Sequence, residues 1–435
     1  MRRVALVEAA IVLCSIFLMA LPGIAAEQIT QKVSISDVTT ASKDDYILGV
    51  YGNTNEDDTI DMRDLTYTKL IFFGKKPETK LADAKYDGKI NLLDFIQIKL
   101  IIVGKEKELT VVDTADRTVT IDMPVERAIL FGHGEYDGEV IRLLGANDRV
   151  VGVSKYIVAK STYFQELSQL PSVGSPWSPD YEQILSIEPD LVITYKTKAD
   201  MVAEKLPGIP VIGMVFYKPD PLPEEVMKLG YIFGEQNAAA HYINDFLNKY
   251  IGRIIAKTEG LAEEEKPKMY MESMHGGVLK QYCGKSGAQQ FIDMCGGRNI
   301  FADIDANLVE VDPEAVIERD PDVIIRFVYK GVGYEADDVT ELKAVRDEIM
   351  NRPEFANLSA VRTGRVYTTA TMFNYGPDYP VAAAYWSKWF HPELFEDLDP
   401  KTIQQEWLTE FQGLDFNLDE HGVFVYHPVE HPDGK

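Results

Sequence analysis

The stretch that decides the fold is Asp190-Leu191-Val192-Ile193-Thr194, a short apolar run that we predict to be a buried strand. Helical patterns flank it at 181–187 and 201–206, and a second apolar run follows at 211–214. Upstream, the runs 128–131 and 150–153 are also predicted strands, with a helix between them that begins near Glu135. Short apolar strands that alternate with amphipathic helices are typical of a parallel α/β lobe.

A long helical pattern separates this lobe from a second one. It runs from Pro223 to about Glu259, which is too long for an ordinary crossover helix. Beyond it, strands are predicted near 268–271, 323–325 and 366–367, with helices near 288–294, 313–318, 338–350 and 380–389. We therefore expect two parallel-sheet α/β lobes, at about 125–222 and 266–400, joined by a linker helix at about 223–260 within a domain that spans 108–435. The polar stretch 411–435 is predicted to be a loose tail.

Composition and charge exclude several classes of protein. The 435 residues include 44 Lys and Arg and 69 Asp and Glu, which gives a net charge of −25. Such a surface repels phosphate backbones, so we do not expect a nucleic-acid partner. The 46% of apolar residues can fill ordinary cores, which excludes general disorder.

The N-terminus has the pattern of a secretory signal. Arg2 and Arg3 precede an apolar stretch from Ala9 to Leu21, and small residues follow up to Ala26. This pattern predicts a signal peptide at 1–26, with an uncleaved membrane anchor as the alternative. We therefore expect an exported protein that is periplasmic or on the cell surface. The two cysteines downstream, Cys283 and Cys295, are expected to be buried free thiols, although export would permit a disulfide.

A repeat with an offset of thirty residues lies between residues 50 and 105. Each copy is a loop rich in oxygen side chains, followed by an apolar helix that ends near a glycine. Oxygen donors at relative positions 1, 3, 5, 7, 9 and 12 can surround a calcium ion. The candidate ligands are Asn53, Asn55, Asp57, Thr59, Asp61 and Asp64 in loop one and Asp83, Asp87, Lys89, Asn91 and Asp94 in loop two. The alternative for each loop is a solvated acidic turn between helices.

Residues 41–107 resemble the dockerin module, a small all-α domain with two calcium loop–helix repeats that binds cohesin domains. The resemblance implies calcium as a structural cofactor and a cohesin-type domain as a partner. Three features depart from the dockerin pattern. Lys85 occupies a ligand position of loop two, Asp58 replaces the usual glycine of loop one, and Leu92-Leu93 replaces a small polar pair.

A series of phrases in the large domain occurs in the same order in a known family. The phrases are Leu144-Gly-Ala-Asn-Asp-Arg-Val-Val-Gly-Val153, Ser178-Pro-Asp-Tyr-Glu182, Ile187-Glu-Pro-Asp-Leu-Val-Ile193, Cys295-Gly-Gly-Arg-Asn-Ile-Phe-Ala-Asp303, Asp320-Pro-Asp-Val-Ile-Ile325 and Leu358-Ser-Ala-Val-Arg-Thr-Gly-Arg-Val-Tyr367. Together they resemble the helical-backbone (class III) substrate-binding proteins of iron-complex and cobalamin ABC importers. The resemblance implies a ligand cleft between two lobes and one acidic residue per lobe, Glu182 and Glu314, that docks onto the permease. An acidic residue in the first turn of a helix also complements the helix dipole, so the two roles are compatible.

The loops that follow the strands are expected to face the cleft and to carry the ligand contacts. The candidates are His133, Tyr136, Trp177, Lys196, Tyr217, His275, Ser286, Tyr329 and Tyr375. Aromatic rings can stack on a macrocycle, histidine and tyrosine can ligate ferric iron, and lysines can pair with carboxylates or an oxyanion. The alternative for each residue is ordinary packing or a solvated loop.

The expected function is capture of a metal chelate, with a ferric siderophore or haem-like complex as the first choice. Cobalamin or a molybdate-type oxyanion is the alternative ligand, and an adhesion or scaffold protein that works through the dockerin-like unit is the alternative class. No metalloprotease, serine-hydrolase, Cys-x-x-Cys or P-loop motif occurs in the sequence. We therefore expect no enzyme activity and no catalytic cofactor.

Overall fold

The computed structural model describes residues 46–132, 134–371, 374–432 and 434. The predicted signal peptide (residues 1–26) and the candidate ligand residue His133 lie outside the described residues. Within the described part, no helix has both the length and the apolar character needed to cross a membrane.

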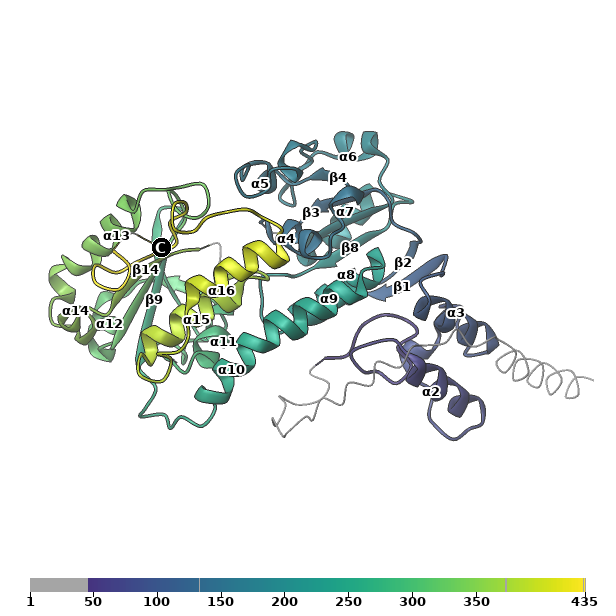
Figure 1. The fold of residues 1–435 in the computed structure, drawn as a ribbon, viewed down its shortest axis with the longest axis horizontal. Coiled ribbons are helices and arrows are strands. Elements are labelled where there is room, and N and C mark those ends of the chain that lie inside the picture. Colours follow the sequence, from purple (N-terminus) through teal and green to yellow (C-terminus); the bar gives the residue numbers. More distant parts are fainter. Residues whose placement is uncertain (1–45, 133, 372–373, 433, 435) are drawn as a thin grey trace, which may run out of the picture. The chain divides into compact units, whose positions relative to one another are not determined.

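Residues 46–107, which we call the N-terminal module, contain the two loop–helix units of the predicted repeat (Figure 1). Helix α2 spans Met62–Phe72, the short turn η1 spans Lys80–Ala82, and helix α3 spans Leu92–Ile102. The Lys69 ammonium group near the end of α2 lies 5.3 Å from the ring of Phe95 near the start of α3, so the two helices pack antiparallel. The loop–helix repeat is therefore confirmed, whereas its resemblance to dockerins stays a prediction.

The two helices of the module begin and end in the same way because the repeat conserves their caps. Each starts with a capping box, formed by Asp61 with Asp64 in α2 and by Asn91 with Asp94 in α3. A glycine follows each helix with a left-handed backbone, for example Gly74 at φ 64°, and this conformation commonly ends a helix.

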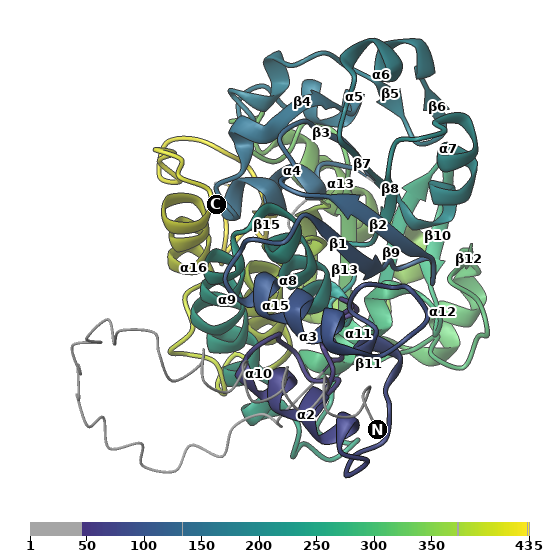
Figure 2. The same ribbon diagram turned by 90° about the vertical axis from the view of Figure 1, so that its right-hand side faces the viewer.

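The first lobe is a four-stranded parallel sheet, as predicted. An antiparallel hairpin of β1 (Glu108–Val112) and β2 (Thr118–Asp122) precedes it (Figure 2). The strand order is β4 (Val150–Val153), β3 (Ala128–Phe131), β7 (Leu191–Tyr195) and β8 (Val211–Met214). The helices between these strands are α4 (Tyr136–Leu143), α5 (Lys155–Val158), α6 (Tyr181–Ile187) and α7 (Ala199–Lys205). Every residue of β3 is buried, as expected for a central strand with both faces covered.

The linker is helical, but it is not one unbroken helix. It consists of α8 (Leu222–Phe233), α9 (Gln236–His241), the π-helical turn η5 (Tyr242–Leu247) and α10 (Asn248–Thr258), which follow one another in Figure 1. The break lies at Gly234, whose φ of 72° closes α8 with a left-handed residue.

The second lobe has a mixed sheet, which corrects the prediction of a purely parallel one. Its order is β12 (Leu308–Glu310), β10 (Val278–Tyr282), β9 (Lys268–His275), β13 (Val323–Val328), β14 (Val366–Ala370) and β15 (Val425–Tyr426), with β11 (Arg298–Asn299) beside β9. Only β11, β9, β13 and β14 pair in parallel. Strand β10 returns antiparallel to β9 through the tight turn at Gly276 and Gly277, because both glycines adopt positive φ.

The helices of the second lobe cover this sheet. They are α11 (Gly287–Met294), α12 (Pro313–Arg319), α13 (Thr340–Met350), α14 (Ser359–Thr363), α15 (Tyr379–Phe390) and α16 (Pro400–Glu406), and α16 continues into the π-helical turn η8 (Trp407–Phe411). Cys283 and Cys295 are buried free thiols, as predicted.

The prediction of a loose C-terminal tail is wrong. Strand β15 pairs with β14, and Phe424 is almost fully buried. Trp407 is completely buried and donates from its indole nitrogen to the Tyr163 hydroxyl of the first lobe at 3.1 Å. The apolar residues of this segment are spaced among polar ones, so composition alone concealed their burial.

Candidate ligand-binding site

A cavity of about 420 Å³ opens where the loops of the two lobes meet. The first lobe contributes the loop after β3 and the start of α4, together with α5 and the turn at Trp177. The second lobe contributes the residues that follow β13 and β14. The lining residues are Gly134, Glu135, Tyr136, Tyr156, Lys160, Trp177, Val328, Tyr329, Val332 and Thr371. A cavity of this volume at the carboxyl ends of parallel strands has the size and place of a small-molecule site.

Tyr156 and Trp177 line the cavity and begin a row of aromatic rings in the first lobe that continues through Tyr195 to Tyr217. The ring centroids of Tyr156 and Trp177 lie 6.5 Å apart, those of Trp177 and Tyr195 5.9 Å, and those of Tyr195 and Tyr217 6.2 Å. The hydroxyls of Tyr195 and Tyr217 are 3.2 Å apart. Trp177 is 49% exposed, and an indole of this exposure at the cavity can contact a flat apolar ligand.

Tyr329, which lines the cavity from the second lobe, belongs to a network of hydroxyl groups around one imidazole. Ser273 Oγ lies 2.6 Å from His275 Nε2 and 3.1 Å from the Tyr282 hydroxyl. The Tyr329 hydroxyl lies 3.4 Å from the same His275 nitrogen. Because β9 alternates its side chains, Ser273 and His275 emerge on one face of the sheet.

Electrostatics keep this network uncharged. Burial, and to a smaller degree Lys280, lower the pKa of His275, which keeps its imidazole neutral. Burial raises the pKa of Tyr282 and of Tyr375 far above the ordinary value, with further contributions from the neighbouring tyrosines. The phenols therefore act as hydrogen-bond donors, and the neutral imidazole retains a lone pair for a proton donor or a metal.

The structure brings together several of the predicted ligand residues. Tyr136, Trp177 and Tyr329 line the main cavity, and Tyr136 also borders a small pocket with Tyr217. Tyr375 and Phe327 border another small pocket, and their ring centroids are 5.7 Å apart.

His275, Lys196 and Ser286 do not line the cavity, although His275 lies 3.4 Å from the hydroxyl of the lining residue Tyr329. Ser286 is buried and donates to the Cys283 carbonyl at 2.7 Å, whereas Lys196 lies in the short turn after β7. The sequence analysis missed Glu135, Lys160 and Ser273. Glu135 follows the end of β3 directly, so the strand-end rule could have found it, but nothing in the sequence distinguishes Lys160 from the other surface lysines.

The two predicted docking acids occupy equivalent places in the two lobes. Glu182 lies in the first turn of α6 and Glu314 in the first turn of α12, and both side chains are exposed. Each helix has an aspartate N-cap, Asp180 and Asp312, that bonds the backbone of the first turn. The caps leave the glutamates free of a capping role.

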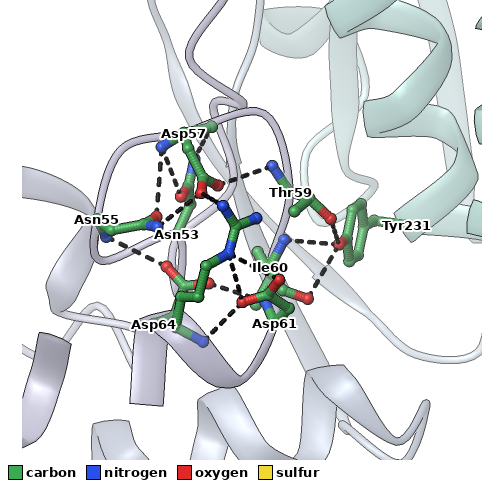
Figure 3. Close-up of polar contacts among 9 residues, drawn as sticks. Asn53, Asn55, Asp57, Thr59, Ile60, Asp61, Asp64 and Tyr231 are labelled. Carbon is green, nitrogen blue, oxygen red and sulfur yellow. Dashed lines mark hydrogen bonds and ion pairs between the residues drawn. The ribbon is translucent and has the colours of Figure 1, made fainter. Parts of the chain in front are cut away.

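Loop one of the N-terminal module is a compact polar network (Figure 3). Asn53 Oδ1 and Asn55 Oδ1 both accept from the Asp57 amide, at 3.2 and 3.3 Å. Asp64 is fully buried and accepts from the Asn55 and Asp61 amides. Burial raises the pKa of Asp64 to about 6.

A contact with the linker distinguishes loop one. The Tyr231 hydroxyl on α8 accepts from the Ile60 amide at 2.8 Å and lies 3.1 Å from the Thr59 hydroxyl (Figure 3). Loop two has no such contact among the described residues, and its Lys85 turns away to pair with Glu108 at 2.8 Å.

Two α/β lobes, a helical linker and a cavity between the lobes define a substrate-binding protein. The sequence profile of the periplasmic binding proteins matches residues 133–371, and the chain belongs to this family. Members of this family are extracytoplasmic solute-binding proteins of ABC importers, and this is the class to which the chain belongs.

Similar proteins extend this assignment. An uncharacterized lipoprotein of Methanocaldococcus jannaschii is 28% identical over 63% of this chain and 72% of its own length. A cobalamin-binding protein of Halobacterium salinarum is 24% identical over 60% of this chain and 68% of its own length. The crystal structure of the TroA-like periplasmic binding protein FepB from Veillonella parvula has the same fold, with a TM-score of 0.62 and 21% identity over 73% of this chain and 99% of that one.

Proposed function

We propose that this protein captures a metal chelate, with a ferric siderophore or haem-like complex as the first choice, and delivers it to a permease. The observation that carries the proposal is one cavity lined by Tyr136, Tyr156 and Trp177 of the first lobe and by Tyr329 of the second. The Tyr329 hydroxyl lies 3.4 Å from His275 Nε2. An aromatic row favours a flat or ring-shaped ligand. A neutral imidazole among phenol hydroxyls can complete the coordination of an iron complex while the hydroxyls bond the oxygens of the chelate.

Cobalamin is the second candidate ligand, because the Halobacterium salinarum relative is named for binding it. The same aromatic wall would contact the face of a corrin ring, and the imidazole could bond to it or to its metal. A molybdate-type oxyanion has less support, because Lys160 is the single basic residue that lines the cavity among the described residues.

Thermal melting with a panel of ligands tests the proposal. The panel is ferric enterobactin, haemin, cyanocobalamin and sodium molybdate. A ligand present at 100 times its Kd stabilises the folded state by about 2.7 kcal/mol, so the true ligand class raises the melting temperature by several degrees. The proposal predicts the largest shift with an iron complex. A larger shift with cyanocobalamin selects the second candidate, and no shift with any of the four contradicts capture of a metal chelate.

Docking to the permease through Glu182 and Glu314 is part of this proposal. Both carboxylates are exposed on equivalent helices of the two lobes, and a permease that carries arginines could bind both at once. The variants E182Q and E314Q should retain ligand binding and lose ligand-stimulated ATP hydrolysis by the cognate importer. Full stimulation by the double variant would contradict this role.

We also propose that loop one binds calcium and that loop two binds it more weakly. The donors of loop one are oxygens, which suits a hard cation, but Arg63 now pairs with Asp57 and Asp61 at 2.9 Å and would have to move aside. Calcium would then supply a positive charge that stabilises the ionised form of the buried Asp64. We expect calcium to raise the melting temperature relative to chelator, and D64N to abolish that shift, whereas D87N in loop two should leave most of it. An equal response to calcium in D64N would contradict the proposal.

Attachment to a cohesin-type domain is the second candidate function, and the exposed apolar face of the module favours it. Phe73 is 64% exposed and Leu93 is 54% exposed, and Met62, Leu92, Ile96 and Val103 are exposed as well. A concentration of exposed apolar side chains on a small module is typical of a protein-binding surface. Cohesin-type domains should retain the wild-type protein in calcium and release L92D/L93D. Retention of both proteins to the same extent would contradict binding through this face.

A further inference from the structure

Two carboxylates from different lobes meet in the interior at the lobe junction. Glu139 belongs to α4 of the first lobe and is 2% exposed, and Asp378 precedes α15 of the second lobe and is 1% exposed. A Cβ atom placed on Gly376 would lie 3.1 Å from Glu139 Oε2, so the glutamate presses against the loop that carries Asp378.

Neither carboxylate is fully partnered. Glu139 Oε2 and Asp378 Oδ1 are buried and accept no hydrogen bond from the described residues. Asp378 is at the N-cap position of α15, yet its side chain does not cap the helix. A buried carboxylate without partners strongly disfavours its ionised form.

The neighbouring cation does not neutralise the pair. Arg142 Nε donates to Gln412 Oε1 at 2.6 Å, and its guanidinium stacks on the rings of Tyr163 and Phe164 at 4.4 and 4.7 Å. Among the described residues no ion pair joins Arg142 to Glu139 or to Asp378.

Several elements pack around the two carboxylates. The linker contributes Tyr242, whose hydroxyl donates to the Pro377 carbonyl at 2.7 Å, and the C-terminal helix contributes Gln412, which donates to the Glu139 carbonyl at 3.2 Å. The titratable and charged groups that face the pair are Glu135, Tyr136, Arg142, Tyr163, Tyr242 and Tyr334. The tyrosines stay neutral, and the positive charges that the described residues place near the three carboxylates are Arg142, which faces Glu139, and Lys160, which faces Glu135.

We propose that Glu139 and Asp378 bind one proton between them, and that this proton is required for the two lobes to pack together at the junction. Tyr163 hydrogen-bonds to Glu139, but one oxygen of each carboxylate stays buried without a partner, and two such carboxylates in one buried site cannot both be ionised at low cost. Lobe packing is thereby coupled to pH, which nothing in the capture of a chelate requires.

The sign of the coupling follows from the direction of both pKa values. Burial raises the pKa of Glu139 and of Asp378. The charges of Asp378 and Glu135 raise the pKa of Glu139 further, and the charge of Glu135 raises that of Asp378. The packed state therefore holds a proton that the unfolded chain has released above its ordinary carboxyl pKa. Stability contributed by the pair is present at low pH and is lost as the pH rises through the raised value, with a change of up to tenfold per pH unit for one proton.

Infrared spectroscopy of the full-length protein tests the proposal directly. The carbonyl band of a protonated carboxylic acid should persist in the wild type above pH 8 and be absent from E139Q/D378N. Asp137 is the matched control, because its pKa is raised to about 7 by burial within the first lobe and its carboxylate bonds the Gly132 amide. The variant D137N should remove only the part of the carbonyl band that titrates near pH 7.

Thermal melting across pH 5 to 9 provides the second readout. The melting temperature of the wild type should fall as the pH rises, and E139Q/D378N should remove most of this pH dependence. The variant D137N should keep the pH dependence above pH 8. A wild type without a protonated carboxyl band above pH 8, or a double variant that keeps the band, would overturn the proposal. Should the double variant not fold, the wild-type band and its pH midpoint still decide the question.

Discussion

The two walls of the cavity differ in chemistry although similar strand-end loops build them. The first-lobe wall contains Tyr156 and Trp177, which begin a row of rings that continues to Tyr217. The second-lobe wall contains Tyr329, whose hydroxyl connects the cavity to the network of Ser273 and His275. The difference suggests that the first lobe contributes apolar contact area to ligand binding. The second lobe would orient the ligand and provide selectivity.

Removal of the His275 imidazole should cause the largest loss of ligand affinity. In H275A we expect roughly a 100-fold loss of affinity for the chelate that stabilises the wild type, which corresponds to about 2.7 kcal/mol. Isothermal titration calorimetry measures it. H421A is the matched control, because His421 is exposed and pairs with Asp337 outside the cavity. Unchanged affinity in H275A would contradict a dominant contribution of the second lobe to ligand affinity.

The pH dependence of binding sharpens the assignment to His275. Burial lowers the pKa of His275, so its neutral form persists below the ordinary value of about 6.5. We expect affinity to stay constant as the pH falls from 8 through that ordinary value, and then to fall by up to tenfold per pH unit as the imidazole is protonated. The fall should be absent from H275A. A decline that begins above pH 7, or one that H275A retains, would assign the proton to another group.

Removal of the indole tests the other wall. In W177A we expect about a tenfold loss of affinity, because an aromatic contact contributes roughly 0.5 to 1.5 kcal/mol beyond the area it buries. W177F should recover most of it. F73A serves as the control, since Phe73 is an exposed ring of the N-terminal module. A loss in W177A larger than that in H275A would reverse the ranking of the two walls.

The sequence predicted the two lobes well because the apolar strands 128–131 and 190–194 alternate with helices in a pattern that few other folds share. It also predicted the loop–helix repeat, since the copies agree residue by residue. It did not predict the antiparallel strand β10, which pairs with β9 across the tight turn at Gly276 and Gly277, or the C-terminal strand β15, whose partner β14 lies far away in the chain. Short strands with mixed polarity carry little signal of their own.

The candidate site was predicted in part for a related reason. Strand-end position and aromatic character indicated Tyr136, Trp177 and Tyr329, and the structure places all three on the cavity. The same rule suggested Ser286, whose hydroxyl instead bonds a backbone carbonyl. It missed Ser273, because this serine lies inside β9 and reaches the site only through the alternation of that strand.

The smallest expected effect separates the ring of Tyr329 from its hydroxyl. In Y329F the ring stays in the cavity and the hydroxyl, 3.4 Å from His275 Nε2, is lost. One neutral hydrogen bond contributes about 0.5 to 1.5 kcal/mol, so affinity should fall by roughly 3- to 10-fold. Y367F is the matched control, because the Tyr367 hydroxyl bonds Glu430 elsewhere in the second lobe. If the hydroxyl acted only on the ligand, Y329F and H275A would add; if it orients the imidazole, the double variant should lose no more than H275A alone, and calorimetry of the three variants distinguishes these two roles.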